Sequence, residues 1–126
     1  YQVADDFTLV GRVDRSFGGE IPRLTTSELL NGVDKQDFIL LADHQPVDLV
    51  ENQEQGVDLQ LSGHTHGGQI WPVGLISDVM GFGESNYGYK RQDNFQVIVS
   101  SGMAGWGYAV RTGHHSEYLM VTIKSK

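Results

Sequence analysis

Leu59-Gln60-Leu61-Ser62-Gly63-His64-Thr65-His66-Gly67-Gly68-Gln69 joins an alternating apolar run to two histidines spaced two residues apart. The alternation from Val57 to Leu61 predicts a β-strand. Extended backbone would point His64 and His66 the same way, and the flanking glycines let the main chain approach an ion closely. Imidazole is the commonest ligand for borderline metals, so the pattern indicates a strand that delivers metal ligands to a loop. The alternative interpretation is a surface turn that happens to carry two histidines.

A third histidine follows another predicted strand. The continuous apolar run Phe38-Ile39-Leu40-Leu41 is typical of a strand buried on both faces, and His44 comes just past its end. Residues 47–55 predict a helix, with Pro46 suited to the first turn. Ligands bind beyond the carboxyl ends of strands in open α/β sheets. This strand, helix and strand therefore predict one sheet edge that carries all three histidines.

The other segments predict further elements of an α/β fold. Expected strands occupy residues 7–13, 70–74, 95–99 and 117–123, and a short capped helix occupies residues 25–31. Pro72 bars residues 70–74 from a central position in the sheet. The stretch 81–90 mixes glycine with aromatics and suits either a binding loop or an ordinary surface loop.

Two of these segments resemble a known family. Gly63-His64-Thr65-His66-Gly67-Gly68-Gln69 is similar to the last signature of the calcineurin-like metallophosphoesterases, and Ile39-Leu40-Leu41-Ala42-Asp43-His44-Gln45-Pro46 resembles the preceding one. The resemblance continues through Gly11-Arg12-Val13-Asp14 and Ser100-Ser101-Gly102-Met103. It implies part of a four-layer α/β/β/α sandwich, here a mixed sheet with flanking helices.

Three signatures of this family have no counterpart in the chain. They are an Asp-x-His, a Gly-Asp-x-x-Asp and a Gly-Asn-His followed by Asp or Glu, and their place would be before Tyr1. We therefore expect residues 1–126 to form a single domain that is the C-terminal part of a metallophosphoesterase. Such a segment alone is expected to be inactive, and uncovered sheet edges or apolar faces predict self-association.

The resemblance implies a centre of two divalent ions, either Mn, Fe or Zn, for hydrolysis of a phosphomonoester or phosphodiester. His44 and His64 would bind one ion and His66 the other, while a bridging aspartate would come from outside this segment. His64 and His66 are the expected catalytic residues. Some relatives are membrane-associated and act on lipid-linked or cell-envelope phosphates, so a lipid-linked substrate is one expectation. The alternative function is a non-catalytic metal-binding or interaction module.

Arginine matches phosphate geometry bidentately, which makes Arg12 or Arg15, and Arg111, candidate substrate contacts. The alternative for Arg12 and Arg15 is surface pairing with Asp5, Asp6 or Asp14. Gln69 is a third candidate substrate-binding residue, or it orients a ligand or the loop. Asp43 is either an acceptor behind the ligands or merely exposed.

The second half of the chain contains aromatic residues with two alternative roles and a further pair of histidines. An apolar wall for the substrate, or core packing, is expected from Trp71, Phe82, Tyr87 and Tyr89. His114 and His115 are adjacent and would face opposite ways on a strand, so we expect neither to be a ligand.

Composition excludes several classes of protein. The chain has 126 residues and no cysteine, which rules out disulfides and thiolate metal sites. Its net charge is -7, with 12 acids and 4 bases in residues 1–60 against 4 acids and 5 bases in residues 61–126. Scattered basic residues do not form a nucleic-acid surface. No apolar run reaches the ~20 residues of a membrane-spanning helix. Localisation, cytoplasmic or membrane-associated, stays open.

Overall fold

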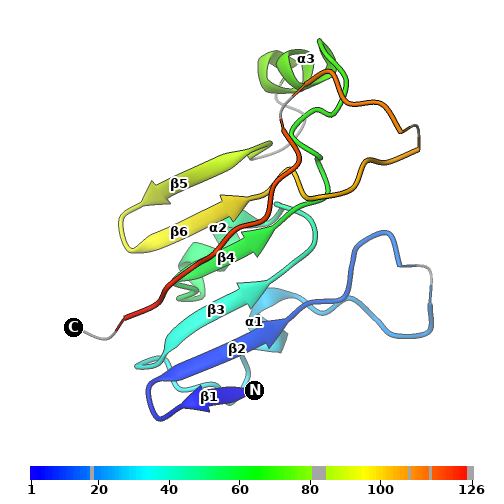
Figure 1. Cartoon of the computed structure of the whole chain (residues 1–126). Coiled ribbons are helices and arrows are strands. Elements are labelled where there is room, and N and C mark those ends of the chain that lie inside the picture. Colours follow the sequence, from blue (N-terminus) through cyan, green and yellow to red (C-terminus); the bar gives the residue numbers. More distant parts are fainter. Residues whose placement is uncertain (18, 81–84, 108, 114, 125–126) are drawn as a thin grey trace.

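The computed structural model describes residues 1–17, 19–80, 85–107, 109–113 and 115–124. These residues form one mixed sheet of six strands in the order β1-β2-β3-β4-β6-β5. The strands are β1 (Gln2–Ala4), β2 (Phe7–Gly11), β3 (Phe38–Ala42), β4 (Leu59–Ser62), β5 (Gly88–Gln92) and β6 (Phe95–Val99). The three helices are α1 (Thr26–Leu29), α2 (Leu49–Glu54) and α3 (Val73–Met80). The expected α/β class is confirmed (Figure 1).

Four adjacent strands of the sheet, β2, β3, β4 and β6, run parallel to one another. Strand β2 pairs with β3, β3 with β4, and β4 with β6, each in parallel register, whereas the edge strands β1 and β5 are antiparallel. Parallel strands end at the same edge, so the loops that follow Gly11, Ala42, Ser62 and Val99 all leave the sheet together (Figure 1). This edge is where the predicted histidines lie.

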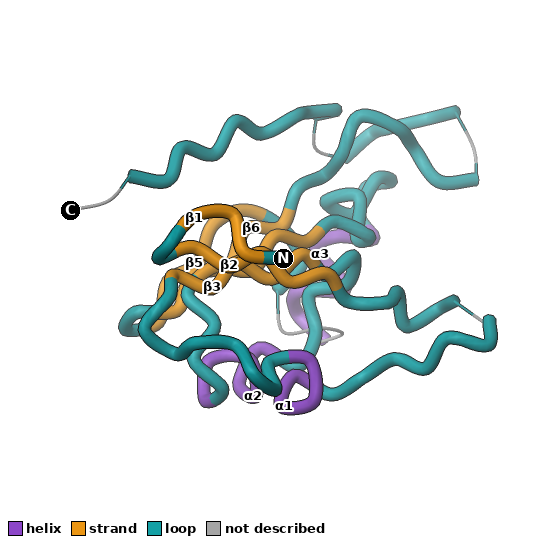
Figure 2. Tube along the Cα trace, turned by 90° about the horizontal axis from the view of Figure 1, so that it is seen from below, coloured by secondary structure: helices purple, strands orange, loops and turns teal. Residues whose placement is uncertain are grey.

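The core lies between the sheet and helices α1 and α2. Val10, Ile39, Leu41, Val97 and Val99 point to this side of the sheet and are almost fully buried. Figure 2 shows α1 and α2 together on one side of the sheet, with the C-terminal segment on the other side. Alternate residues of β2 show the asymmetry, because Thr8 and Val10 are buried while Leu9 is 37% exposed.

A buried polar chain joins the helices to the sheet. Thr26 donates to Asn52 at 2.5 Å, Asn52 donates to Gln60 at 2.7 Å, and Gln60 donates to Ser62 at 3.0 Å. The side chains of Thr26, Asn52 and Gln60 are fully buried. Each satisfies the next, so this chain of hydrogen bonds fixes α1, α2 and β4 relative to one another.

Two expected strands are wrong. Residues 70–74 do not form an edge strand, because helix α3 begins at Val73, directly after Pro72, and proline is well tolerated at a helix start. Residues 117–123 run extended but pair with no strand among the described residues. They are held at Glu117 instead: its backbone N–H donates to the Gly102 carbonyl at 3.0 Å, and its carboxylate accepts from the Ser101 backbone, the Ser100 hydroxyl and the Tyr87 hydroxyl.

Other boundaries moved by a few residues. The first predicted strand ends at Gly11 rather than Val13, and the predicted helix 47–55 is α2, which begins after Asp48. Within the expected loop 81–90, residues 81–84 lie outside the described part and β5 begins at Gly88. None of the described helices is long and apolar enough to cross a membrane.

The buried polar chain predicts a large effect for Asn52→Ala. The substitution leaves the Thr26 hydroxyl and the Gln60 amide without their partner in a dry site, at a cost of about 2–4 kcal/mol in the free energy of unfolding. Asn31→Ala, on an exposed position after α1, is the matched control and should stay within about 0.5 kcal/mol. Urea unfolding of both variants measures the difference. Equal stabilities for the two variants would contradict this role of Asn52.

The Glu117 carboxylate predicts a pH-dependent contribution to stability. The hydrogen bond from the Ser101 backbone N–H is the main reason that the pKa of Glu117 is lowered. A carboxyl whose pKa is lower in the native than in the unfolded state stabilises the protein above its unfolded pKa, and this stabilisation is lost as the pH falls. Wild type should therefore exceed Glu117→Gln in stability at pH 7, and the gap should close below about pH 4.5. A gap that stays constant down to pH 3 would show that the charge is irrelevant.

Candidate metal centre

The rings of His44 and His64 meet at the carboxyl edge of the sheet. His44 follows β3 and His64 follows β4, and the backbone N–H of Gly63 donates to the carbonyl of His44 at 3.0 Å. The Nε2 atom of His44 lies 3.2 Å from Nδ1 of His64. Two nitrogen ligands about 2.1 Å from one ion would be separated by roughly 3.0–3.4 Å. The pair therefore has the spacing that a shared divalent ion requires.

His66 lines the same cavity as His44 and His64 but takes no part in the contact between their rings. The cavity has a volume of about 740 Å³ and is lined by the three histidines together with Asp14, Ser16, Thr65, Gly68, Gln69, Ile70, Val73 and Trp106. The Nδ1 atom of His66 lies 3.1 Å from the carbonyl oxygen of Ala104. A carbonyl only accepts, so Nδ1 carries the proton of this bond and the lone pair of Nε2 is left for a metal.

Both histidines of the loop have unusual backbone conformations. The φ angles of His64 and His66 are 66° and 51°, in the left-handed region that only a few per cent of residues other than glycine adopt, asparagine, aspartate and histidine more often than the rest. Gly67 and Gly68 continue with φ angles of 60° and 67°. A β-carbon on Gly68 would lie 2.2 Å from the α-carbon of Gly74, so only glycine fits where the loop passes α3.

Asp14 is a site residue that the sequence patterns missed. Its Oδ2 atom lies 3.6 Å from Nε2 of His44, and its Oδ1 atom accepts from the backbone of Ser16 at 2.6 Å. That backbone hydrogen bond is the main reason that the pKa of Asp14 is lowered, with a smaller contribution from His44. Its position three residues past the end of β2, beside His44, which lies two residues past the end of the parallel neighbour β3, is the signal that could have found it.

The histidines do not make a complete metal site alone. Among the described residues, no three His, Asp or Glu side chains are grouped closely enough to hold one ion. The nitrogen donors fit a divalent transition metal, but a bimetallic centre also needs a bridging carboxylate. Further ligands are therefore needed beyond those that the described residues bring together.

Arg12 does not face the cavity. Its side chain is 4% exposed, and its guanidinium lies 3.1 Å from Asp48 and 3.6 Å from Asp43. The expectation of a substrate contact is therefore corrected, because a buried and paired guanidinium is not accessible to a phosphate. For Arg12 the alternative pairing with Asp5, Asp6 or Asp14 also named the wrong partners, whereas Arg15 is exposed, as that alternative expects of a surface residue.

Asp43 is buried, and its hydrogen bonds go to Arg23 and to Gln45 rather than to a histidine ring. Its buried carboxylate accepts from Arg23 at 2.8 Å and from the backbone of Gln45 at 3.2 Å. Asp43 therefore anchors the turn that contains His44 to the segment around Arg23, which the sequence patterns had not singled out.

The polar groups of Gln69 and Arg111 form hydrogen bonds with the backbone of neighbouring loops. Gln69 is buried, accepts from the backbone of Trp106 at 2.6 Å, and donates to the carbonyls of Trp106 and Val110. The guanidinium of Arg111 donates to backbone carbonyls, among them that of His66 at 2.9 Å. Both residues attach the loop 101–113 to the histidine loop, and of the two only Gln69 also lines the cavity.

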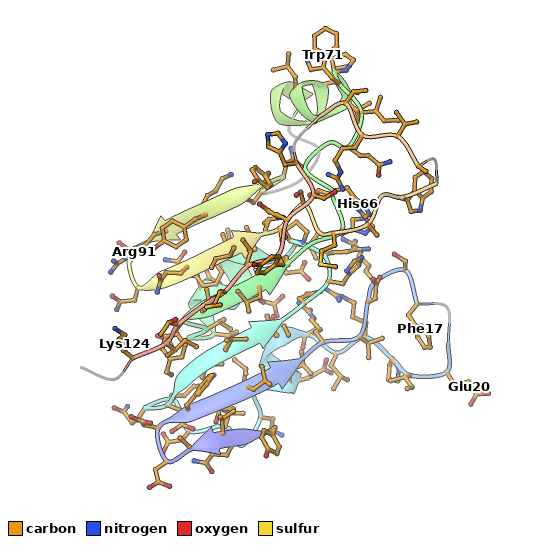
Figure 3. All side chains as sticks on the ribbon, in the orientation of Figure 1. Phe17, Glu20, His66, Trp71, Arg91 and Lys124 are labelled. Atoms are coloured by element: carbon orange, nitrogen blue, oxygen red, sulfur yellow. The ribbon has the colours of Figure 1, made fainter. Side chains whose placement is uncertain are left out.

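The apolar wall of the cavity consists of other residues than expected. Ile70, Val73 and Trp106 line it. Trp71 is 70% exposed and lies at the outer tip beyond α3 (Figure 3). Tyr87 and Tyr89 are hydrogen-bonded to Glu117 and Gln96 away from the histidines, and Phe82 lies outside the described residues. The side chain of His115 is exposed and does not line the cavity, while His114 lies outside the described residues.

Curated relatives share the name metallophosphoesterase. An uncharacterized metallophosphoesterase of Aquifex aeolicus is 34% identical over 126 residues, which cover 97% of this chain and 48% of the relative. One of Campylobacter jejuni is 36% identical over 88 residues, covering 69% and 23%. A transmembrane protein with metallophosphoesterase domain of Danio rerio is 28% identical over 103 residues, covering 80% and 23%.

The chain spans about half the length of the Aquifex relative and less of the others. No family model and no solved structure matches it. The alignment with the Aquifex protein nevertheless extends over nearly the whole chain. Over nearly its whole length the chain is similar to proteins named metallophosphoesterases, as a segment of the calcineurin-like superfamily would be.

Proposed function

We propose that this chain supplies the histidine ligands of a two-metal centre that hydrolyses a phosphomonoester or phosphodiester. The observation that carries the proposal is the 3.2 Å separation between the facing nitrogens of His44 and His64, on a cavity that His66 also lines. Relatives named metallophosphoesterases support the same class of reaction.

In this proposal His44 and His64 hold one ion and His66 holds the other through Nε2. Two divalent ions, Mn, Fe or Zn, would supply an activated water and compensate the charge of the phosphoryl oxygens. The chain's own contribution is to orient the rings. The bond from Gly63 to the carbonyl of His44 joins the two loops, and the bond between His66 and Ala104 fixes the third ring.

The remaining ligands would be carboxylates. Asp14 is one donor at the cavity, 3.6 Å from His44, and the others would come from outside the 126 residues. We therefore infer that this segment alone binds metal incompletely and does not turn over substrate. A metal-binding module without activity is the competing function, and metal content measured beside hydrolysis in the intact protein separates the two.

The cavity favours a substrate with an apolar portion. Its histidine end is polar, whereas Ile70, Val73 and Trp106 give it an apolar end. Trp106 is 78% exposed, so its ring offers a free surface to a ligand. A phosphate attached to a lipid or a cell-envelope carrier has this amphiphilic character, and the name of the Danio rerio relative places that protein at a membrane. We propose an amphiphilic phosphoester as the substrate class.

His44→Ala in the intact protein should abolish the proposed hydrolysis. Removing a group that merely supports a ligand costs about 10–100-fold, so loss of a ligand should exceed that range in kcat. Hydrolysis of bis(p-nitrophenyl) phosphate and metal content by mass spectrometry measure the effect. His115→Ala is the matched control, because that exposed side chain does not line the cavity. Activity and metal content within twofold of wild type in His44→Ala would refute the assignment.

Trp106→Ala should separate apolar from small substrates. Loss of this aromatic surface removes about 1.5 kcal/mol or more of apolar contact, which is roughly tenfold in affinity. KM should rise by that factor for a phosphoester with a long acyl or aryl group and stay unchanged for a small one. Trp71→Ala, outside the cavity lining, is the control. Equal changes in KM for both substrate types would remove the amphiphilic substrate from the proposal.

A further inference from the structure

The guanidinium of Arg111 binds three backbone carbonyls. One terminal nitrogen donates to His66 at 2.9 Å, and the other donates to Ala104 at 3.0 Å and to Ser101 at 3.3 Å. These carbonyls belong to the histidine loop and to two points of the loop after β6. Arg111 therefore links two segments that are 45 residues apart at their most distant contact.

One of these carbonyls is also the partner of the His66 ring. The Ala104 oxygen accepts from Arg111 and lies 3.1 Å from Nδ1 of His66. A carbonyl oxygen has two lone pairs, so it can accept both bonds at once. Arg111 thus fixes the backbone of His66 on one side and the hydrogen-bond acceptor of its imidazole on the other.

This arrangement needs a planar fork. Arginine presents its donors in a rigid plane that can bridge several acceptors, whereas a lysine ammonium is a flexible point donor. Gln69 holds the same loop at other points, through the backbone of Trp106 and the carbonyl of Val110, the residue before Arg111. Figure 3 shows His66 at the place where these segments meet, between the sheet and the α3 tip.

We propose that Arg111 is a positioning residue for His66: it fixes the imidazole as the tautomer with the proton on Nδ1 and directs Nε2 into the cavity. The relevance to hydrolysis rests on the proposed function, but the structural effect does not. Without Arg111, the Ala104 carbonyl is free to turn away, and the His66 ring can take the other tautomer, in which Nε2 is protonated and unable to bind a metal.

The test compares Arg111→Gln and Arg111→Lys with Arg91→Gln in the intact protein, freed of metal. Arg91 lies on β5 and donates to the backbone of Asp93, away from the cavity. The control Arg91→Gln therefore also removes one guanidinium, but not one that contacts the histidine loop. Long-range proton–nitrogen correlation spectra report the tautomer of each histidine ring. Thermal unfolding confirms that each variant is folded.

In wild type and in Arg91→Gln, His66 should show Nδ1 protonated and Nε2 unprotonated. In Arg111→Gln both tautomers of His66 should be populated, while the signals of His44 stay unchanged, and Arg111→Lys should be intermediate. A single Nδ1-protonated tautomer in folded Arg111→Gln would overturn the proposal. If Arg111→Gln fails to fold, the same spectrum of Arg111→Lys decides.

Metal binding gives a second readout in the intact protein. Removing a group that orients a ligand typically weakens metal affinity by about 10–100-fold, and we expect a loss in this range for Arg111→Gln by titration with Zn²⁺. If Arg111→Gln changes the tautomer of His66 but hydrolyses substrate as fast as wild type, the role of Arg111 is limited to the structure of the loop. Absence of hydrolysis in wild type, with the tautomer change present, would reject the proposed function and retain the role of Arg111.

Discussion

The parallel register of β2, β3, β4 and β6 is the constraint on which the candidate site depends. All four strands end at the same edge of the sheet. Residues that are far apart in sequence therefore lie close together in the short loops that follow these strands. Asp14, His44 and His64 stand two or three residues past their strands, and the closest contacts of the site join these residues. The buried chain from Thr26 to Ser62 supports this geometry from below, because it fixes the helices that hold the central strands in place.

Side chains that bind backbone carbonyls and amides hold the loops at this edge. Asp43 anchors the His44 turn, and Gln69 and Arg111 anchor the loop after β6 to the histidine loop. Loops have few apolar contacts, so such bonds replace a core as the source of their rigidity. Ion pairs and hydrogen bonds at the carboxyl edge therefore have an organising role that the number of charged residues alone would not indicate.

The strands with strong local patterns could be predicted from the sequence, since β3, β4 and β6 are determined by apolar runs of the right length. The approach of His44 to His64 also followed from strand order, and the family from two motifs. Three features could not be predicted. Helix α3 replaced an expected strand because the Pro72 that bars a central strand also suits a helix start. Residues 117–123 have a strand-like pattern but no partner among the described strands. The partners of Arg12, Gln69 and Arg111 depend on loop conformations that no periodicity encodes.

The left-handed backbone of His64 and His66 has a consequence for how this protein can change. Each such residue costs of order 1 kcal/mol relative to glycine, so the histidine loop is a place where the fold is less stable than it could be. Selection or engineering for thermostability alone would drive these two positions toward glycine or asparagine and erase the imidazoles. The two imidazoles thus stand where glycine would stabilise the fold more, which fits a role in ligand chemistry rather than in folding.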